Sequence, residues 1–245
     1  MNKFPKKLNS IRIAKKISQS GLGSRREVEK WILLGRVSVD NDIVNRPNIF
    51  VTKENIIKVD GKIIPYEDKA RLWKYNKPKG IITTRNDPQG RKTIFEDISQ
   101  KVPYIISVGR LDINSEGLML LTNNGNLAKY LEHPSQAFKR KYRVRVFGEV
   151  NENKLNTIKS TFKIENFEYK PMEITVEKKQ KSNTWLNITL IEGKNREIRK
   201  VMQHINLQVN RLIRISFGDF KLGKLKSSKI IEVSESEIKK INYNG

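Results

Sequence analysis

The residues best suited to chemistry in this chain are carboxylates, because it contains no cysteine and only two histidines. This composition excludes thiol catalysis, disulfides and Cys-based zinc sites, and we expect neither a metal nor a cofactor. The chain also lacks P-loop, dinucleotide-binding and serine-nucleophile motifs. Two carboxylates, Asp112 and Glu116, stand in GRLDINSEG, directly before the apolar run Leu118–Leu121.

Asp112 occupies a position that suits a reactive group. Small polar residues and Gly117 follow it and lead into a predicted strand, so its carboxylate would lie on a loop supported by a rigid sheet. There it could act as a nucleophile or as a base. These letters alone favour a simpler interpretation, an aspartate that closes a turn before a strand, and Glu116 has the same interpretation.

Tyr142 is the second candidate, in KRKYRVRVFG (residues 139–148). Strict alternation puts it on one face of a predicted strand with two valines, and puts Arg143 and Arg145 on the other face. Tyr142 therefore points inward, where its ring could pack against a ligand.

Arg199 is the third candidate, in GKNREIRKVMQHI (residues 193–205). Four apolar residues at helical spacing form the buried stripe of a predicted helix; they are Ile198, Val201, Met202 and Ile205. Arg196 and Lys200 lie opposite this stripe, and Arg199 falls at its edge. A partly buried arginine needs an anionic partner, and Asp112 is the simplest one. The alternative is an arginine at the rim of the core, with only its aliphatic stem packed there.

The charge of the chain indicates a polyanionic partner. Lysine and arginine number 49 against 26 acidic residues, a net charge of +23. A field of this sign favours nucleic acid over a membrane, although lysine-rich composition can also follow from an AT-rich genome. No apolar stretch approaches the roughly 18 residues that span a bilayer, and the N-terminus lacks the apolar core of a signal peptide. We therefore expect a cytoplasmic protein.

An aspartate, a tyrosine and an arginine around an apolar pocket would suit chemistry on a nucleotide. The tyrosine ring would stack on a base extracted from RNA, the arginine would keep the carboxylate ionised, and the carboxylate would attack the sugar or the ring. The spacing suggests this arrangement and leaves the structural interpretations open.

The elements that must position these residues fall into two blocks. In the first block, apolar spacing predicts a helix over residues 11–17 that ends near Gly21. A second helix begins at Ser24, which has capping-box spacing, and ends at Gly35. Short strands follow, and IIKVDGKII (residues 56–64) predicts a hairpin.

Arg25 and Arg26 are informative because they lie in the first turn of the second predicted helix. Cations there oppose the positive end of the helix dipole and cost stability. A bound anion would reverse this effect, so the block resembles a phosphate site of a small RNA-binding module. The alternative is two solvated arginines.

The second block begins after a predicted linker at residues 65–69. Strands are predicted at residues 72–75, 80–84, 118–122, 142–147, 172–176, 185–190, 212–217 and 230–233. Helices are predicted at residues 126–132, 152–160 and 195–205 and near the C-terminus. Consecutive strands with few helices between them predict an α+β fold with a mainly antiparallel sheet.

The first block, IRIAKKISQSGLGSRREVEKWILLGRVSVD with IIKVDGKII, resembles the S4 RNA-binding domain. The resemblance covers about the first 65 residues and implies that structured RNA is bound. It implicates six residues in RNA binding: Arg12, Lys15, Ser24, Arg25, Arg26 and Lys30.

The second block resembles the RNA pseudouridine synthases, in the branch that carries an S4 domain. GRLDINSEGLMLLTNNG is similar to their catalytic motif, and three further segments follow the family in position: KPKGIITT, LAKYLEHPSQAFKRKYRVRVFG and EGKNREIRKVMQHINLQVNRLIRISFGDFKL. The resemblance implies an S4 domain with a short linker at residues 1–68 and a catalytic domain at residues 69–245.

The family implies a role for each candidate residue. Asp112 is the catalytic aspartate, Tyr142 packs on the target base, and Arg199 pairs with the aspartate. Arg110 helps displace the target base and Ile198 contributes to the apolar wall. These enzymes cut the N1 glycosidic bond of a uridine and rejoin the uracil through C5 without metal or cofactor. Whether the aspartate attacks C1′ or takes a proton from C2′ stays open.

NREIR followed by VNRLIRISFGDFKL most resembles the synthases of large-subunit (23S) ribosomal RNA, closest to the B type. The small-subunit relatives have a lysine in place of Arg199. We expect a monomer that acts on ribosomal RNA or a pre-ribosomal particle. The alternatives are another ribosomal RNA site, a non-catalytic RNA-binding factor in ribosome assembly and, from its charge, a DNA-binding regulator.

Overall fold

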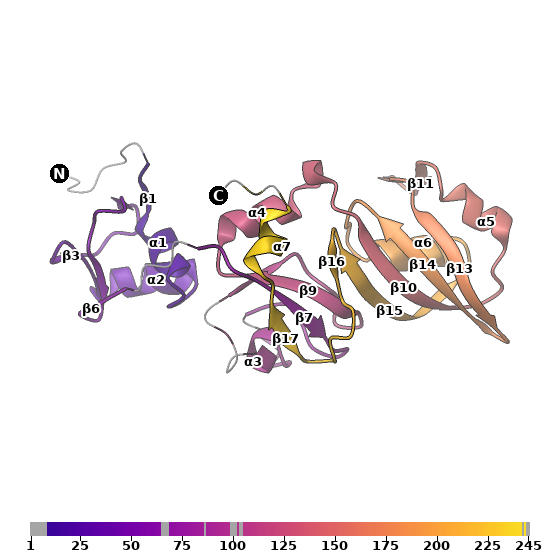
Figure 1. Ribbon diagram of the computed structural model, residues 1–245, viewed down its shortest axis with the longest axis horizontal. Coiled ribbons are helices and arrows are strands. Elements are labelled where there is room, and N and C mark those ends of the chain that lie inside the picture. Colours follow the sequence, from indigo (N-terminus) through magenta and orange to yellow (C-terminus); the bar gives the residue numbers. More distant parts are fainter. Residues whose placement is uncertain are drawn as a thin grey trace.

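The computed structural model describes residues 9–64, 69–85, 87–98, 102, 105–241 and 243, and Figure 1 shows a small N-terminal unit beside a larger one. Of the predicted linker, only Lys69 lies within the described residues.

The N-terminal unit has two helices and six short strands: β1 (Ile11–Arg12), α1 (Ile13–Gln19), α2 (Arg25–Leu33), β2 (Val37–Val39), β3 (Asp42–Val44), β4 (Phe50–Val51), β5 (Ile57–Val59) and β6 (Lys62–Ile63). Four strands form a sheet in the order β3-β2-β5-β6, and β1 pairs with β4. The predicted capping box of Ser24 is confirmed, since its hydroxyl accepts from Glu27 and its N–H donates to the Glu27 carboxylate. The predicted hairpin is confirmed as well, with Asp60 and Gly61 at positive φ between β5 and β6.

The larger unit is built on one sheet of nine strands. Its elements are β7 (Leu72–Lys77), α3 (Ile94–Ile98), β8 (Ile106–Val108), β9 (Glu116–Thr122), α4 (Gly125–Glu132), η1 (Pro134–Gln136), β10 (Arg140–Phe147), α5 (Glu152–Thr157), β11 (Phe162–Ile164), β12 (Phe167–Tyr169), β13 (Glu173–Gln180), β14 (Asn183–Leu190), α6 (Glu197–His204), β15 (Gln208–Phe217), β16 (Phe220–Lys221), β17 (Ile230–Glu232) and α7 (Glu235–Lys239). The strand order is β13-β14-β10-β15-β9-β7-β17, with β16 on β15 and β8 on β9. Every pairing between these strands is antiparallel except β15 with β9, so the predicted α+β class and mainly antiparallel sheet are confirmed.

The sheet buries apolar side chains on both faces, which explains the apolar run in β9. Met119 and Leu121 face a core that includes α3, α5 and α6, whereas Leu118 and Leu120 face a second core with α4. Alternation along a strand sends successive side chains to opposite faces. Because both faces of β9 are covered, every position in the run is apolar, and the strand is a rigid support for the loop before it.

One predicted strand is wrong. Residues 80–84 contain only an isolated bridge between Ile82 and Thr93, because this segment bonds to the loop before β9 instead of joining the sheet. The Gly80 N–H donates to the carbonyl of Ile113 at 2.8 Å, and the Thr83 hydroxyl donates to the carbonyl of Leu111 at 2.9 Å. The segment therefore supports the Asp112 loop from outside the sheet.

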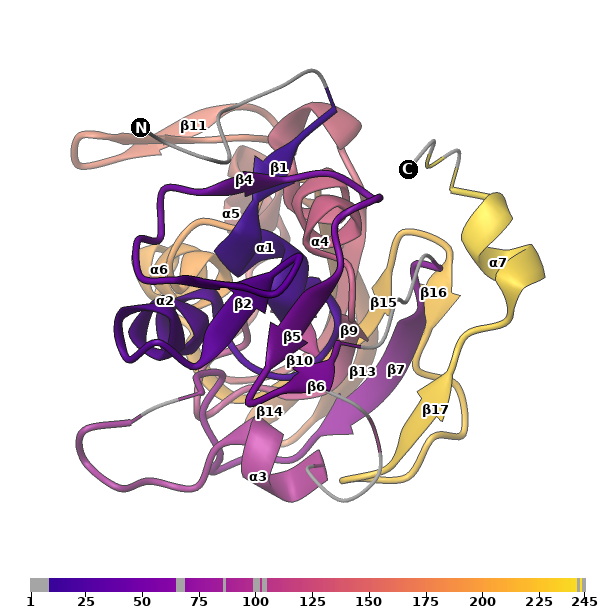
Figure 2. The same cartoon turned by 90° about the vertical axis from the view of Figure 1, so that its left-hand side faces the viewer.

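The two units meet through α1, α2 and α4. In Figure 2 the N-terminal unit lies in front of the larger unit, and in Figure 1 its helices face α4. Lys15 donates its Nζ to Asn126 Oδ1 at 3.0 Å. Burial, followed by the charges of Arg25 and Lys129, lowers the pKa of Lys15. Cations from both units therefore converge at this junction.

Candidate active site

The Asp112 loop is held by its backbone. The Ser115 N–H donates to the backbone carbonyl of Asp112 at 2.9 Å and closes the turn between β8 and β9. In the part of the chain that the structure describes, no N–H group donates to the Asp112 carboxylate, so this side chain does not close an Asx turn. Its side chain is 33% exposed. The backbone of the loop is therefore held in place, and the carboxylate is open to a ligand.

Gly117 allows this loop to enter the sheet. It lies at φ +101°, and a Cβ there would be 2.3 Å from the backbone oxygen of Arg214. Gly117 pairs with Arg214 in the parallel contact of β9 with β15, one residue after Glu116 pairs with Ile213. Only glycine has both the conformational freedom and the small size that the contact requires.

Lys77 lies beneath the loop and was not singled out from the sequence. It is fully buried, and its Nζ donates to the carbonyl oxygens of Ser115 at 2.9 Å and Pro78 at 3.0 Å. Burial lowers its pKa to about 8, while the charges of Asp112 and Glu116 act in the opposite direction. In a chain so rich in lysine, only its place on the buried face of β7 could have indicated this role.

A cavity of about 660 Å³ opens beside Asp112. Its lining includes Arg110, Asp112, Tyr142, Arg196, Ile198 and Arg214. Tyr142 is 8% exposed and Ile198 is 4% exposed, so an aromatic ring and an aliphatic side chain form part of an apolar wall. The structure thus brings together four residues that the family resemblance assigned to one site: Arg110, Asp112, Tyr142 and Ile198.

Arg199 differs from the expectation. Its guanidinium donates to the carbonyl oxygens of Asn114 at 2.9 Å and Val209 at 3.1 Å. Among the described residues it forms no ion pair with Asp112 within 4.0 Å. Burial and then the charge of Arg196 lower the pKa of Arg199, while Asp112 acts in the opposite direction. Arg199 therefore connects the Asp112 loop to β15 through two hydrogen bonds. Its charge acts on the Asp112 carboxylate from more than 4.0 Å away.

Arg196 is the cation nearest to the Asp112 carboxylate in the described part of the chain. Its Nη1 lies 3.9 Å from Asp112 Oδ2, and its side chain is 49% exposed. The helical pattern had placed it opposite the buried stripe, and α6 begins only at Glu197 because Arg196 has a left-handed backbone. A side-chain pattern carries no signal for that backbone conformation.

Glu197 is a buried acid in the cavity lining that the sequence did not indicate. Its Oε2 accepts from the backbone N–H of Lys194 at 2.8 Å, and its Oε1 has no partner in the structure. The side chain is 4% exposed, and burial raises its pKa to about 7. Glu197 thus stabilises the turn at the start of α6 and carries a proton over part of the physiological pH range.

Two further arginines line the cavity from the sheet. Arg214 lies opposite Tyr142 in the β10–β15 ladder and donates to the carbonyl of Leu118 at 2.7 Å. Arg140 donates to the carbonyl of Ile191 at 3.0 Å and stacks over the Phe217 ring at 4.8 Å. Positive charge therefore surrounds Asp112 on several sides.

Glu116 has a structural role. Its two carboxylate oxygens accept from the Arg211 guanidinium, each at 2.9 Å. This bidentate pair joins β9 to β15 on the sheet surface, so the role of Glu116 is structural, but within the residues that the structure describes its carboxylate does not close a turn as the simpler interpretation had it.

The residues predicted for RNA binding in the N-terminal unit differ in exposure. Arg12, Arg25, Arg26 and Lys30 are exposed. Ser24 is half-buried and caps α2, and Lys15 is half-buried at the junction with α4. The exposed four are free to meet a ligand, whereas the other two already have partners within the protein.

The described residues contain no group of three or more His, Cys, Asp or Glu that could hold a metal ion. They also contain no helix with the length and apolar character needed to cross a membrane.

A family model described as RNA pseudouridylate synthase matches residues 71–204, and the S4 domain model matches residues 11–57. The chain belongs to the RNA pseudouridylate synthase family. An RNA pseudouridine synthase of Rickettsia prowazekii is 45% identical over 229 residues, which cover 94% of this chain and 97% of the relative. The ribosomal large subunit pseudouridine synthase B of Salmonella typhimurium is 41% identical over 221 residues, covering 88% of this chain and 76% of the relative.

A crystal structure of a pseudouridylate synthase has the same fold, with a TM-score of 0.64 and 24% identity over 95% of this chain and all of that one (100%). An RNA pseudouridylate synthase acts on a nucleotide of RNA. The cavity beside Asp112, with its carboxylate, the inward ring of Tyr142 and several arginines, is chemically suited to bind one. The expected family and its S4 domain are confirmed.

Proposed function

We propose that this protein converts one uridine of large-subunit ribosomal RNA to pseudouridine, with Asp112 as the catalytic residue. The observation that carries the proposal is the Asp112 carboxylate, which accepts no hydrogen bond from any N–H group of the described residues and lies at a cavity of about 660 Å³. A cavity of this size suits one nucleotide extracted from the RNA.

Each neighbouring residue has a role in this proposal. Tyr142 and Ile198 form the apolar surface on which the uracil packs. Arg110 is exposed at the same cavity and helps displace the target base. Arg199 acts on the aspartate through the loop, because it holds the carbonyl of Asn114, two residues after Asp112.

The reaction rearranges bonds within one nucleotide. The carboxylate of Asp112 attacks C1′ or removes a proton from C2′, and the N1–C1′ bond breaks. The uracil turns against Tyr142 and a C5–C1′ bond forms. As it forms, the bond between Asp112 and C1′ breaks on the first route, or the proton returns to C2′ on the second. C5 then loses its proton and N1 gains one. Catalysis then rests on positioning and on the carboxylate's charge.

The choice of large-subunit RNA is supported by the relatives named ribosomal large subunit pseudouridine synthase B, such as the one from Salmonella typhimurium at 41% identity. The net charge of +23 suits such a substrate. We place the reaction in the cytoplasm, where bacterial ribosomes assemble. We also propose that a monomer suffices, because one chain supplies Asp112, Tyr142 and Arg199.

The test is carbodiimide primer extension on ribosomal RNA from cells that lack this protein, before and after incubation with it. A single new stop in large-subunit RNA, absent with Asp112→Asn, would support the chemistry and the target together. A stop in small-subunit RNA would overturn the target, and no stop in free RNA or in pre-ribosomal particles would overturn the activity.

A further inference from the structure

Arg196 has a strained backbone at the edge of the active site. Its φ of 53° and ψ of 31° are left-handed, a region that arginine rarely adopts. The chain holds it there: Lys194 N–H donates to the Glu197 carboxylate at 2.8 Å, and Lys200 N–H donates to the Arg196 carbonyl at 3.0 Å. Strain that the surrounding structure maintains beside a reactive group indicates a functional constraint.

The strained backbone turns the Arg196 side chain toward Asp112. The 3.9 Å between Nη1 and Oδ2 is too long for a hydrogen bond, and the guanidinium donates to no other described residue. Because the side chain is also 49% exposed, its N–H groups are available to a ligand.

The other arginines of the cavity and of the Asp112 loop are less available. Arg140, Arg199 and Arg214 each donate to at least one backbone carbonyl. Arg110 donates to no backbone carbonyl of the residues that the structure describes, and it is the residue proposed to displace the base. Arg196 is therefore a second arginine whose donors are available at the reacting carboxylate.

We propose that Arg196 binds a phosphate next to the target uridine and leaves Asp112 when the RNA enters. This inference rests on the proposed function. The ribose that reacts at Asp112 carries a phosphate on each side, so a guanidinium 3.9 Å from that carboxylate is near both. The planar guanidinium matches phosphate with two parallel hydrogen bonds. The exchange also removes a cation from Asp112 at the stage when its carboxylate reacts.

The variant Arg196→Asn tests this contact without adding strain, because asparagine tolerates the left-handed region better than most residues. We expect an unchanged or higher melting temperature. We also expect kcat/KM to fall roughly tenfold to a hundredfold, the loss of one charge-assisted hydrogen bond or a bidentate pair. Arg196→Lys keeps the charge but not the planar fork, and should recover part of the loss.

A double-mutant cycle identifies the partner. The substrate is an RNA fragment with the target uridine, in which the phosphate 5′ or 3′ of that uridine is replaced by a neutral methylphosphonate, one at a time. At one of the two positions, the replacement should slow single turnover by the wild type about as much as Arg196→Asn does. The same replacement should then cost the variant little.

The control is Lys200→Asn, which removes one charge from the exposed side of α6, where the Lys200 ammonium lies over the Phe167 ring. It should keep the full methylphosphonate penalty. If the wild type forms product and the two losses add at both positions, the Arg196 contact is overturned while the proposed function stands. If the wild type forms no product on the unmodified RNA, both are overturned.

Discussion

At the scale of the residue, Asp112 is notable for what its side chain does not do. Backbone hydrogen bonds from Ser115 and Gly80 hold its loop, and the buried ammonium of Lys77 donates to the carbonyl of Ser115. The carboxylate itself contributes little to folding, so it can be changed with little structural cost. This separation makes a clean test of the chemistry possible.

Asp112→Asn should abolish isomerisation and leave RNA affinity nearly intact, because an anionic carboxylate does not attract phosphate. The measurements are pseudouridine formation and a filter-binding titration with the same RNA. A parallel loss of affinity would contradict the catalytic assignment of Asp112.

Glu197 makes a prediction about pH. Burial raises its pKa from 4.5 to about 7, so the folded state binds the extra proton between these values. The free energy of unfolding therefore includes the full contribution of this proton below pH 4.5. That contribution is lost as the pH rises from 4.5 to 7. Glu197→Gln mimics the neutral form. Its free energy of unfolding, relative to that of the wild type, should therefore rise by up to about 3 kcal/mol as the pH increases from 4.5 to 8.

Urea unfolding of wild type and Glu197→Gln at pH 5 and pH 8 measures this gain. The exposed Glu149 offers the matched control, and Glu149→Gln should differ little between the two values. An equal effect of Glu197→Gln at both values would show that the carboxyl does not titrate in this window.

At the scale of the element, the active site depends on how β9 meets β15. Directly after the Asp112 loop, Gly117 lies in close contact with the backbone of Arg214 in the parallel pairing. A side chain at this position would push β9, which follows the Asp112 loop, away from β15. The Val209 carbonyl of β15 anchors Arg199.

Gly117→Ala should destabilise the fold by about 2 to 5 kcal/mol, the sum of backbone strain and a steric clash. Gly90→Ala is the control, since Gly90 also has positive φ but nothing lies within 4 Å of its missing Cβ. It should cost only about 1 to 2 kcal/mol of strain. Equal losses in chemical denaturation would mean that the strands do not need the close contact.

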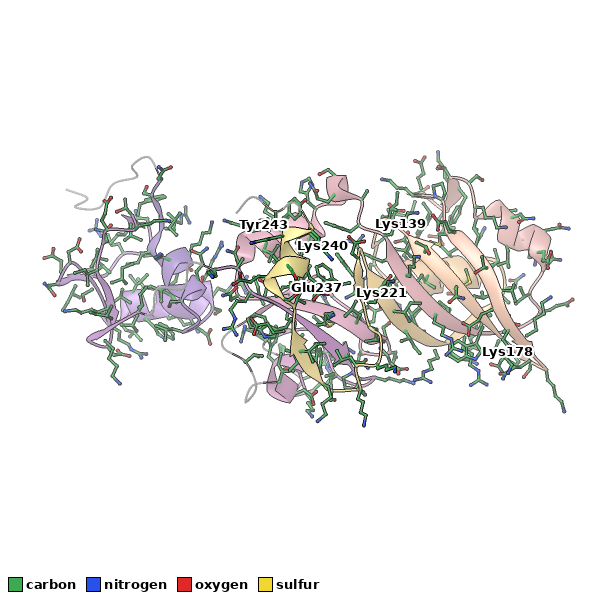
Figure 3. The ribbon with its side chains drawn as sticks, in the orientation of Figure 1. Lys139, Lys178, Lys221, Glu237, Lys240 and Tyr243 are labelled. Atoms are coloured by element: carbon green, nitrogen blue, oxygen red, sulfur yellow. The ribbon has the colours of Figure 1, made fainter. Side chains whose placement is uncertain are left out.

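At the scale of the whole molecule, exposed cations occur on both the S4 unit and the sheet. Arg25 and Arg26 are exposed in the first turn of α2, a helix at the junction with α4, and Lys178 lies on β13 at the far side of the larger unit (Figures 1 and 3). The S4 family implies that RNA binds at α2. Phosphate contacts there would make binding depend on salt.

Arg25→Ala with Arg26→Ala should weaken RNA binding and reduce the slope of log K against log salt by roughly one to two. Lys178→Ala with Lys179→Ala removes the same charge from β13 and should change the slope less. If both pairs change it equally, the α2 arginines make no specific phosphate contact.

Local signals in the sequence were enough for much of this protein. The capping box of Ser24, the alternation around Tyr142 and the apolar stripe of α6 each depend on neighbours in the chain, so they could be predicted. The catalytic motif around Asp112 led to the family, and the α+β class followed from the succession of strands. The sequence also placed Asp112 on a loop before a strand, as the structure has it.

Only the tertiary structure decided which charges meet. Arg196 and Asp112 are distant in the chain, and their approach depends on the β9–β15 contact and on a left-handed backbone at Arg196. Sequence spacing instead favoured Arg199, which lies in α6 and donates to backbone carbonyls. Lys77 and Glu197 were missed for the same reason: their burial depends on packing between segments that are far apart in the chain. Side-chain type and periodicity determine the elements, whereas the pairing of long charged side chains depends on the fold that brings those elements together.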